Sequence, residues 1–273
     1  MAQRLEIVSA ERIRAELERL LLSPYPRRGL ELLVHTGICD IVLPEVSALQ
    51  DTVDEHRRHK DVYEHTLTVL QQAMDLETGP DGDVPGPDLR LRLAALMHDI
   101  GKPATRRFMP DGTVTFHAHD YVGARMTAKR MRALHFDKQT IKDVSRLVEL
   151  HLRFHGYADS PWSDSAVRRY VTDAGPLLAR LGCLTRADVT PANRRKAAML
   201  SHAYDDLERR IEALRQQEEL AAIRPELDGQ EIMTELGIKP GPEVGKAYKF
   251  LLDLRMERGP IGKELAREAL HSW

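Results

Sequence analysis

Apolar residues recur at helical spacing along most of this chain, and no other sequence feature restricts its fold as strongly. In "SAERIRAELERLLLS", for example, Ile13, Leu17 and Leu21 form one stripe behind Ser9, a residue type that caps helices. Comparable patterns predict helices over 26–37, 61–76, 89–100, 120–134, 137–154, 164–175 and 193–220. The segment 106–116, with "PDG" between extended stretches, predicts one hairpin. We therefore expect an all-α protein with one small β excursion.

The composition excludes several classes of protein. The 273 residues carry 40 basic and 42 acidic side chains, so no global charge indicates nucleic-acid binding. The N-terminus lacks the apolar core of a signal peptide, and no apolar stretch is long enough to cross a bilayer. Cys39 and Cys183 stand far apart beside apolar neighbours, which predicts reduced, buried thiols. We expect a cytoplasmic protein with no membrane partner.

Two prolines mark changes in the character of the sequence. Near Pro44 the N-terminal helices give way to a histidine-rich part, and after Pro225 the chain becomes a series of short helices and turns. We predict three domains, which are a helical neck-like segment at 1–44, a central domain at 45–224 and a helical tail at 225–273.

Six side chains of the central domain are of types that bind metal ions, and each interrupts an apolar pattern on a predicted helix or at its end. They are His65, His98, Asp99, His119, His151 and Asp188. Imidazole nitrogen together with carboxylate oxygen suits Mn, Ni, Co, Mg, Fe or Zn, as one ion or two.

Each of these residues also has an ordinary structural interpretation. His65 or His151 alone would be a hydrogen-bonded core histidine, and Asp188 would be a helix cap. The adjacent pair His98–Asp99 in "LAALMHDIGK" is harder to explain in that way. An unpaired carboxylate at the inner end of an apolar helix costs several kcal/mol unless a cation or donors meet it.

The order of His65, then His98–Asp99, then Asp188 resembles that of the HD phosphohydrolase superfamily. The resemblance implies that these four residues hold one divalent metal. Some members bind a second metal through two further histidines, and His119 in "HDYVGA" and His151 match those places.

A divalent ion at such a site would polarise a phosphoryl oxygen and activate its bound water. Asp99 would orient that water as well as bind metal, and Lys102, one turn on, would meet a phosphate as a point charge. Arg106 and Arg107 would add a phosphate rim. The alternative for these three cations is ordinary solvated surface charge.

A closer resemblance extends over nearly the whole chain. The segments "RLEIVSAERIRAELERLLLSPYPRRGLELLVHTGICDIVLPE", "HKDVYEHTLTVL", "HDIGKPATR" and "LDGQEIMTELGIKPGPEVGKAYKFLLDLRMERG" look like the neck, body and tail of bacterial, actinobacterial-type CCA-adding tRNA nucleotidyltransferases and poly(A) polymerases. That resemblance implies helices that hold tRNA, with an HD domain among them.

One element of that family is missing from this sequence. The Gly-rich stretch and Asp-x-Asp pair of its catalytic head are absent, and Asp81–Asp83 stands in a turn-rich loop. We therefore expect a portion of a longer protein or a separately encoded HD relative, with no nucleotidyl transfer by this chain alone. Candidate RNA contacts, which are equally consistent with solubilising charge, are Arg194, Arg195, Lys196, Lys246 and Lys249.

The sequence thus supports two hypotheses. The main one is a metal-dependent phosphohydrolase or phosphodiesterase that acts on nucleotides, 2′,3′-cyclic nucleotides or RNA ends. The alternative is the tRNA-binding body of a CCA-adding enzyme without its head, in which the metal site is vestigial or structural.

Overall fold

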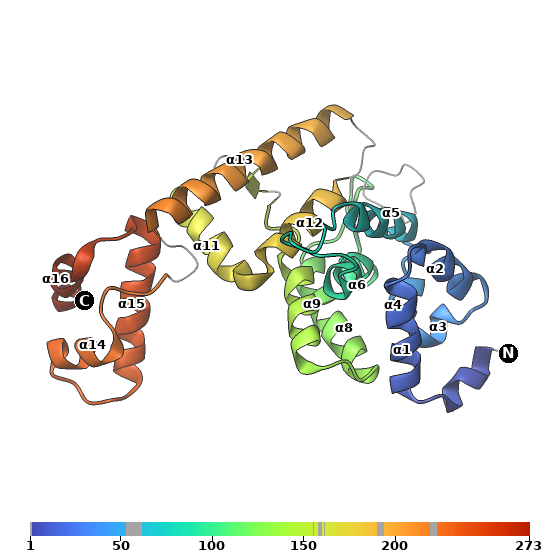
Figure 1. The fold of residues 1–273 in the computed structure, drawn as a ribbon, viewed down its shortest axis with the longest axis horizontal. Coiled ribbons are helices and arrows are strands. Elements are labelled where there is room, and N and C mark those ends of the chain that lie inside the picture. Colours follow the sequence, from blue (N-terminus) through green and yellow to red (C-terminus); the bar gives the residue numbers. More distant parts are fainter. Residues whose placement is uncertain are drawn as a thin grey trace. The chain divides into compact units, whose positions relative to one another are not determined.

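The chain folds almost entirely into helices, as the sequence predicts (Figure 1). The computed structural model describes residues 2–52, 62–154, 156–157, 160, 162–189, 194–218 and 223–273. Within these ranges the one sheet has two strands, and no described helix has the length and apolar composition needed to cross a bilayer. The expected all-α class is confirmed.

Two compact units make up the structure. The first comprises Met1–Phe154 and Pro176–Ser201, and the second comprises His155–Gly175 and His202–Trp273. The division reflects where the chain packs on itself, whereas the domain boundaries near residues 44 and 224 were drawn from composition. Those boundaries remain predictions.

The first unit begins with a group of short helices. They are η1 (Ala2–Ile7), α1 (Ala10–Leu21), α2 (Pro26–His35), α3 (Cys39–Val42) and α4 (Pro44–Ser47). Ser9 occupies the N-cap position of α1, as expected. Its side chain, however, makes no capping hydrogen bond. Cys39 is buried as predicted, whereas Cys183 is only half-buried; neither forms a disulfide with a described residue.

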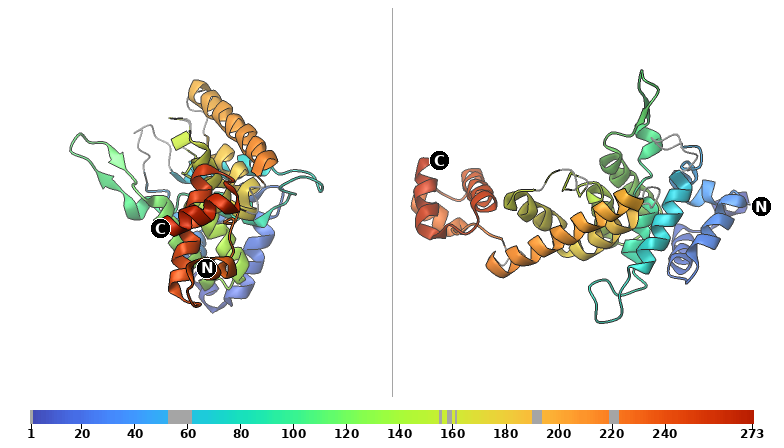
Figure 2. Two further views of the ribbon diagram at one scale, coloured as in Figure 1. Left: turned by 90° about the vertical axis from the view of Figure 1, so that its left-hand side faces the viewer. Right: turned by 90° about the horizontal axis from the view of Figure 1, so that it is seen from above.

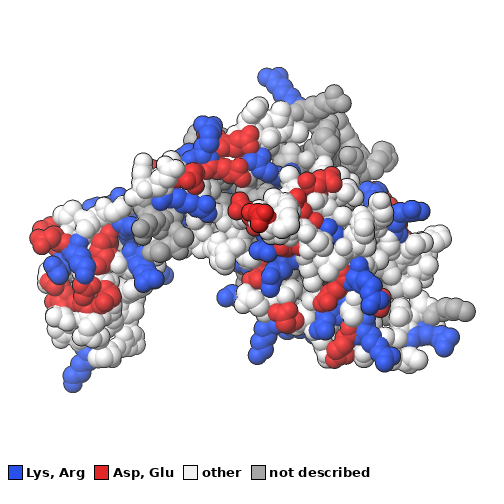
Figure 3. Space-filling view, viewed as in Figure 1, with Lys and Arg blue, Asp and Glu red and all other residues white. Residues whose placement is uncertain are grey.

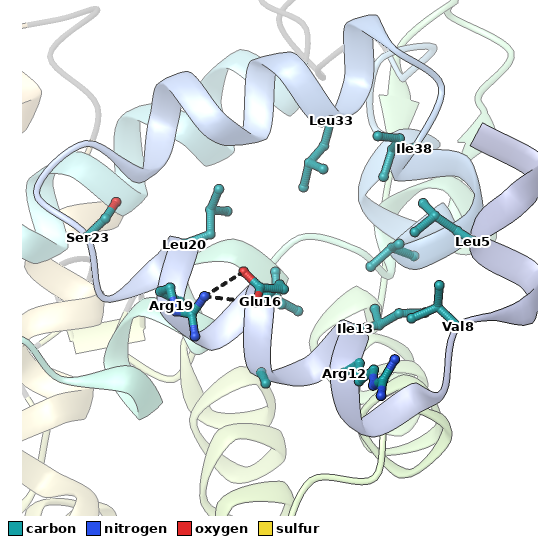
Figure 4. A pocket seen from close by; sticks show the side chains of 13 residues that line it. Leu5, Val8, Arg12, Ile13, Glu16, Arg19, Leu20, Ser23, Leu33 and Ile38 are labelled. Atoms are coloured by element: carbon teal, nitrogen blue, oxygen red, sulfur yellow. Dashed lines mark hydrogen bonds and ion pairs between the residues drawn. The ribbon is translucent and has the colours of Figure 1, made fainter. Parts of the chain in front are cut away.

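A groove of about 860 Å³ lies between η1, α1, α2 and α3 (Figure 4). Its lining is mainly aliphatic, with Leu5, Val8 and Leu33 among the side chains that point into it. Arg19 stands at its margin, paired with Glu16 at 2.9 Å. A mainly apolar lining does not supply the positive charge that contacts to an RNA phosphate backbone require.

Five longer helices form the core of the first unit: α5 (Val62–Asp75), α6 (Leu89–Met97), α8 (His119–Ala133), α9 (Lys138–Leu150) and α12 (Leu178–Asp188). Helix α6 is central and contacts α5, α9 and α12. Every residue of α6 from Leu91 to Met97 is buried, which explains why it lacks a polar face.

The charged residue inside α6 is compensated. Arg92 is buried, pairs with Glu77 at 2.6 Å and donates a hydrogen bond to the carbonyl oxygen of Leu21 at 2.7 Å. Breaking a buried pair of this kind leaves one charge uncompensated, so Arg92 fixes α6 against α1 and the loop before α6.

The predicted β excursion is a small hairpin. After the short helix α7 (Lys102–Thr105), strands β1 (Arg107–Phe108) and β2 (Val114–Thr115) pair antiparallel, with Arg107 opposite Thr115. The hairpin stands away from the helices of its unit (Figure 2), and Phe108, in the strand pair next to the turn, is 72% exposed.

The second unit contains α11 (Asp164–Ala174) and the C-terminal helices α14 (Gly229–Leu236), α15 (Pro242–Arg258) and α16 (Gly262–Ser272). The chain passes from one unit to the other at three points. They lie after Phe154, after Gly175 in η2 (Gly175–Leu177), and after Ser201 within the long helix α13 (Arg194–Glu218). Helix α14 starts with a capping box of Asp228 and Glu231. The apolar core of the tail includes Leu227, Ile232, Ala247, Leu251, Ala266 and Leu270.

Candidate metal centre

The apolar helix α6 delivers the His98–Asp99 pair into the interior of the first unit. The helix ends at Met97, His98 is its C-cap, and the two side chains are 0% and 1% exposed. Burial of an imidazole and a carboxylate at one point is costly unless charge and hydrogen bonds compensate it. The neighbouring helices supply that compensation.

Residues from three helices form the first ligand group. His65 Nε2, from α5, lies 2.9 Å from Asp188 Oδ1 at the end of α12. His98 Nε2 lies 3.4 Å from His65 Nε2 and 3.5 Å from Asp188 Oδ1. Because Asp188 is the last residue of α12, where the helix dipole disfavours an anion, it does not act as an N-cap.

Asp99, His119 and His151 form the second ligand group, in which the ligand atoms lie within 4.8 Å of one another. Asp99 Oδ1 is 3.3 Å from His119 Nε2 at the start of α8. The other carboxylate oxygen of Asp99 is 3.2 Å from His98 Nε2. Asp99 therefore lies between the two groups and faces both.

The three buried histidines share one hydrogen-bonding arrangement. Each Nδ1 lies 2.6–2.8 Å from the carbonyl oxygen three residues earlier, at Ala95, Phe116 and Val148 respectively. Since a carbonyl only accepts, Nδ1 donates a hydrogen bond to it, and Nε2 is the nitrogen that faces the cluster. Metal-binding histidines are oriented in this way.

A buried ring nitrogen of this cluster also lacks a hydrogen-bond partner. His151 Nε2 has none among the described residues, although His151 is 1% exposed. An orphaned, buried acceptor is costly in a protein interior, and a cation would satisfy it. Four imidazole nitrogens and two carboxylates thus fit one or two divalent ions, the donor set of Zn, Mn, Fe, Co and Ni sites.

The electrostatics of the cluster favour positive charge. Burial opposes protonation of His98, but the carboxylates of Asp99 and Asp188 outweigh it and raise the pKa of His98 to about 10. Burial likewise opposes ionisation of Asp99, yet His98 and Lys102 hold the pKa of that carboxyl well below its usual range. Burial and then the charge of His98 lower the pKa of His151 to about 4, which leaves it neutral at neutral pH.

The three cations predicted to contact a phosphate occupy different environments: one lies in the cluster and two are exposed. Lys102 Nζ is 2.8 Å from Asp99 Oδ2 and 5.6 Å from the centre of the Phe116 ring, so it belongs to the cluster. Arg106 is exposed and donates a hydrogen bond to the carbonyl oxygen of Asp51 at 3.3 Å. Arg107 is exposed on β1.

Two backbone features that the sequence did not point to hold His119 in place. Ala118 has a φ of 61°, a left-handed conformation unusual for a residue with a side chain, immediately before His119. Gly101 packs directly on the backbone of α8, where an added Cβ would lie 2.1 Å from the His119 carbonyl oxygen.

The predicted RNA contacts lie outside this centre. The side chains of Arg194 and Lys196 fall outside the described residues, and Arg195 is exposed on α13. Lys246 pairs with Glu243 at 2.7 Å, and Lys249 is exposed on α15 in the second unit. Their role in RNA binding remains a prediction.

Helices that enclose a metal-binding cluster in which a His, a His-Asp pair and an Asp follow one another along the chain define a protein with an HD domain. The HD domain family matches residues 62–193, and "Probable RNA and SrmB- binding site of polymerase A" matches residues 1–49. The chain therefore carries a polymerase-A-type RNA-binding segment followed by an HD domain.

Comparison with curated proteins identifies the family more closely. The chain is 36% identical to an A-adding tRNA nucleotidyltransferase of Deinococcus radiodurans, over 100% of this chain and 60% of that protein. It is also 36% identical to a CC-adding tRNA nucleotidyltransferase of Thermus thermophilus, over 96% of this chain and 56% of that protein. These matches confirm the family resemblance: the chain corresponds to a C-terminal portion of the CCA- and A-adding tRNA nucleotidyltransferases.

More distant relatives cover only part of the chain. A multifunctional CCA protein of Neisseria gonorrhoeae is 32% identical over 54% of this chain and 33% of that protein. The chain spans about three fifths of the length of the relatives that match it throughout.

Proposed function

We propose that this chain binds tRNA as the helical body of a tRNA nucleotidyltransferase. The observation that supports this most strongly is the match of all 273 residues, including the tail, to an A-adding relative. An HD domain alone would not require the tail or the N-terminal segment, and that segment matches an RNA-binding family. The comparisons thus favour the alternative hypothesis from the sequence over a free-standing hydrolase.

Binding of an unmodified tRNA transcript tests this function. We expect an affinity that falls at least about 10-fold between 50 and 200 mM salt, because contacts to phosphates release counterions. Fluorescence anisotropy with labelled tRNA measures it, and the charge reversals Arg195→Glu and Lys249→Glu are expected to weaken it. Absence of tRNA binding at 50 mM salt would rule the proposal out.

We propose, as a second function, that the HD centre hydrolyses phosphate esters. The observation that favours it is the convergence of six ligand side chains, with the Nε2 atoms of the three buried histidines turned to the cluster by the hydrogen bonds of their Nδ1 atoms. A vestigial site would have no need of a complete ligand set. Phosphomonoesters, nucleotides, 2′,3′-cyclic nucleotides and RNA ends are the substrates of this chemistry.

The residues of the centre have distinct tasks in that reaction. A divalent ion there would polarise a phosphoryl oxygen and lower the pKa of a bound water. The Asp99 carboxylate, held ionised, orients the water and accepts its hydrogen bond. Lys102, at 2.8 Å from Asp99, keeps that carboxylate charged and adds a positive charge for the phosphate.

Removal and return of metal tests the second function. We expect a chelated and dialysed protein to lose hydrolysis of 2′,3′-cyclic AMP and to regain it with at least one of Mn, Ni, Co, Mg, Fe or Zn. Elemental analysis should find one or two metals per chain after reconstitution. No turnover of cyclic or linear nucleotides with any of these ions would exclude the hydrolase while leaving tRNA binding unaffected.

A further inference from the structure

One face of α8 carries an exposed row of an aromatic ring and three cations. Tyr121, Arg125, Lys129 and Arg132 follow one another at intervals of four, four and three residues. At 100° per residue they fall within an arc of about 80°, and Arg125 and Arg132 are about 10 Å apart along the axis. Tyr121 is 57% exposed, and all three cations are exposed. We call these four residues the α8 row.

The cations of the α8 row have no ion-pair partner in the described part of the chain. By contrast, Arg130 on the same helix is held by Glu45 at 2.8 Å. Asp120 is the one acidic residue among the 15 of α8. The face shown in Figure 3 mixes both signs of charge. The α8 row is a local concentration of positive charge that no described acidic residue pairs with.

The row borders a shallow, open depression whose lining residues all belong to α8. This depression, of about 590 Å³, is lined by Val122, Met126 and Ala128 together with the three cations of the row. Apolar lining beside cations and an exposed tyrosine provides what single-stranded nucleic acid requires, namely charge for phosphates and a platform on which bases stack. Cations that only keep the protein soluble would need neither an apolar depression nor an exposed tyrosine ring beside them.

The row lies on the side of α8 opposite to the metal centre. Helix α8 begins at His119, whose Nε2 lies 3.3 Å from Asp99 Oδ1, and Tyr121 follows two residues later. At 100° per residue, Tyr121 is turned by about 200° from His119, so the exposed row faces away from the cluster of metal ligands. Charge complementarity favours a polyanion, and the stacking surface favours RNA over an acidic protein.

We propose that the α8 row binds a single-stranded RNA segment, with its cations on successive phosphates and Tyr121 stacked on a base. This inference rests on the proposed tRNA binding.

Paired charge reversals test the inference. We expect Arg125→Glu with Lys129→Glu to weaken tRNA binding at least 10-fold and to reduce the slope of log K against log salt by about one to two. The matched control is Lys138→Glu with Lys142→Glu, two exposed lysines of the adjacent helix α9, which should bind as the wild type does. Binding is measured by anisotropy with chelator present, which makes the readout independent of metal and catalysis.

Two further variants separate contact from folding. The milder Arg125→Gln with Lys129→Gln should weaken binding in the same direction while the circular dichroism melt stays that of the wild type. Tyr121→Ala should weaken it about 5- to 100-fold and remove a photo-cross-link from 4-thiouridine RNA to the peptide that contains residue 121.

The outcomes distinguish this inference from the function on which it rests. If the wild type does not bind tRNA, both are overturned. If the wild type binds and the α8 variants bind equally well without loss of the cross-link, the α8 row is not an RNA surface, and tRNA binding by the chain stands. An acidic protein would then be the partner to seek for this face.

Discussion

Asp99→Asn is expected to reduce metal-dependent hydrolysis by about 10²–10⁴-fold, the usual contribution of a group that positions or deprotonates the attacking water. The reason is the place of Asp99 between the ligand groups, with one oxygen 3.3 Å from His119 Nε2 and the other 3.2 Å from His98 Nε2. An amide keeps the shape of the side chain but removes the charge and replaces one acceptor by a donor that would face these nitrogens.

The same substitution should change the metal content even where no turnover is measured. We expect the bound metal, determined by elemental analysis after reconstitution, to fall by at least half, because Asp99 faces both ligand groups. Asp83→Asn, the same chemical change in an exposed loop, should leave metal and activity as in the wild type. Full activity and full metal content in Asp99→Asn would show that the cluster is not the hydrolytic centre.

Much of this fold could be predicted because burial imposes a helical period on the sequence. The apolar spacing located α5, α6, α8 and α9 to within a few residues, and the "PDG" turn located the hairpin. The helix predicted over 137–154 ends earlier, at Leu150, and His151 stands at its C-cap. A histidine that leaves the helix can turn its ring into the cluster, which periodicity alone does not indicate.

The shared position of Asp99 could not be predicted from the order of the ligands. That order joins His65, His98, Asp99 and Asp188, and one oxygen of Asp99 does lie 3.2 Å from His98 Nε2 and 3.7 Å from His65 Nε2. The other oxygen lies 3.3 Å from His119 Nε2, so that Asp99 also faces the second group. The pairing of Lys102 with Asp99 was also missed, because it depends on the turn between α6 and α7. The α8 row differs in this respect: it lies on a single helix, so the helical spacing of charge in "YVGARMTAKRMR" is enough to indicate it.

Gly101 shows how a glycine can be required for space rather than for conformation. Its φ of −77° suits any residue, so the backbone conformation at this position does not require glycine. An added Cβ would lie 2.1 Å from the His119 carbonyl oxygen and 2.7 Å from the Gly123 amide nitrogen, both backbone atoms. Neither atom can move without shifting α8, and with α8 the ring of His119.

Gly101→Ala is therefore expected to lower the thermal midpoint and the metal content together. Overpacking of this kind costs about 1–3 kcal/mol, equivalent to about 2–12 °C for a unit of this size. The midpoint is measured by circular dichroism with and without metal, and the metal content by elemental analysis. Because the displaced residue is a ligand, the stabilisation that metal gives to the wild type should shrink in the variant.

The matched control is Gly245→Ala, at an exposed position within α15 where an added Cβ meets no atom within 4 Å. Alanine has the higher helix propensity, so this substitution should leave the midpoint unchanged or raise it slightly, by up to about 1 kcal/mol in free energy of unfolding. The contrast isolates the contact with α8 from the general effect of replacing a glycine. A Gly101→Ala protein as stable and as rich in metal as Gly245→Ala would mean that the close approach of the HD turn to α8 does not position His119.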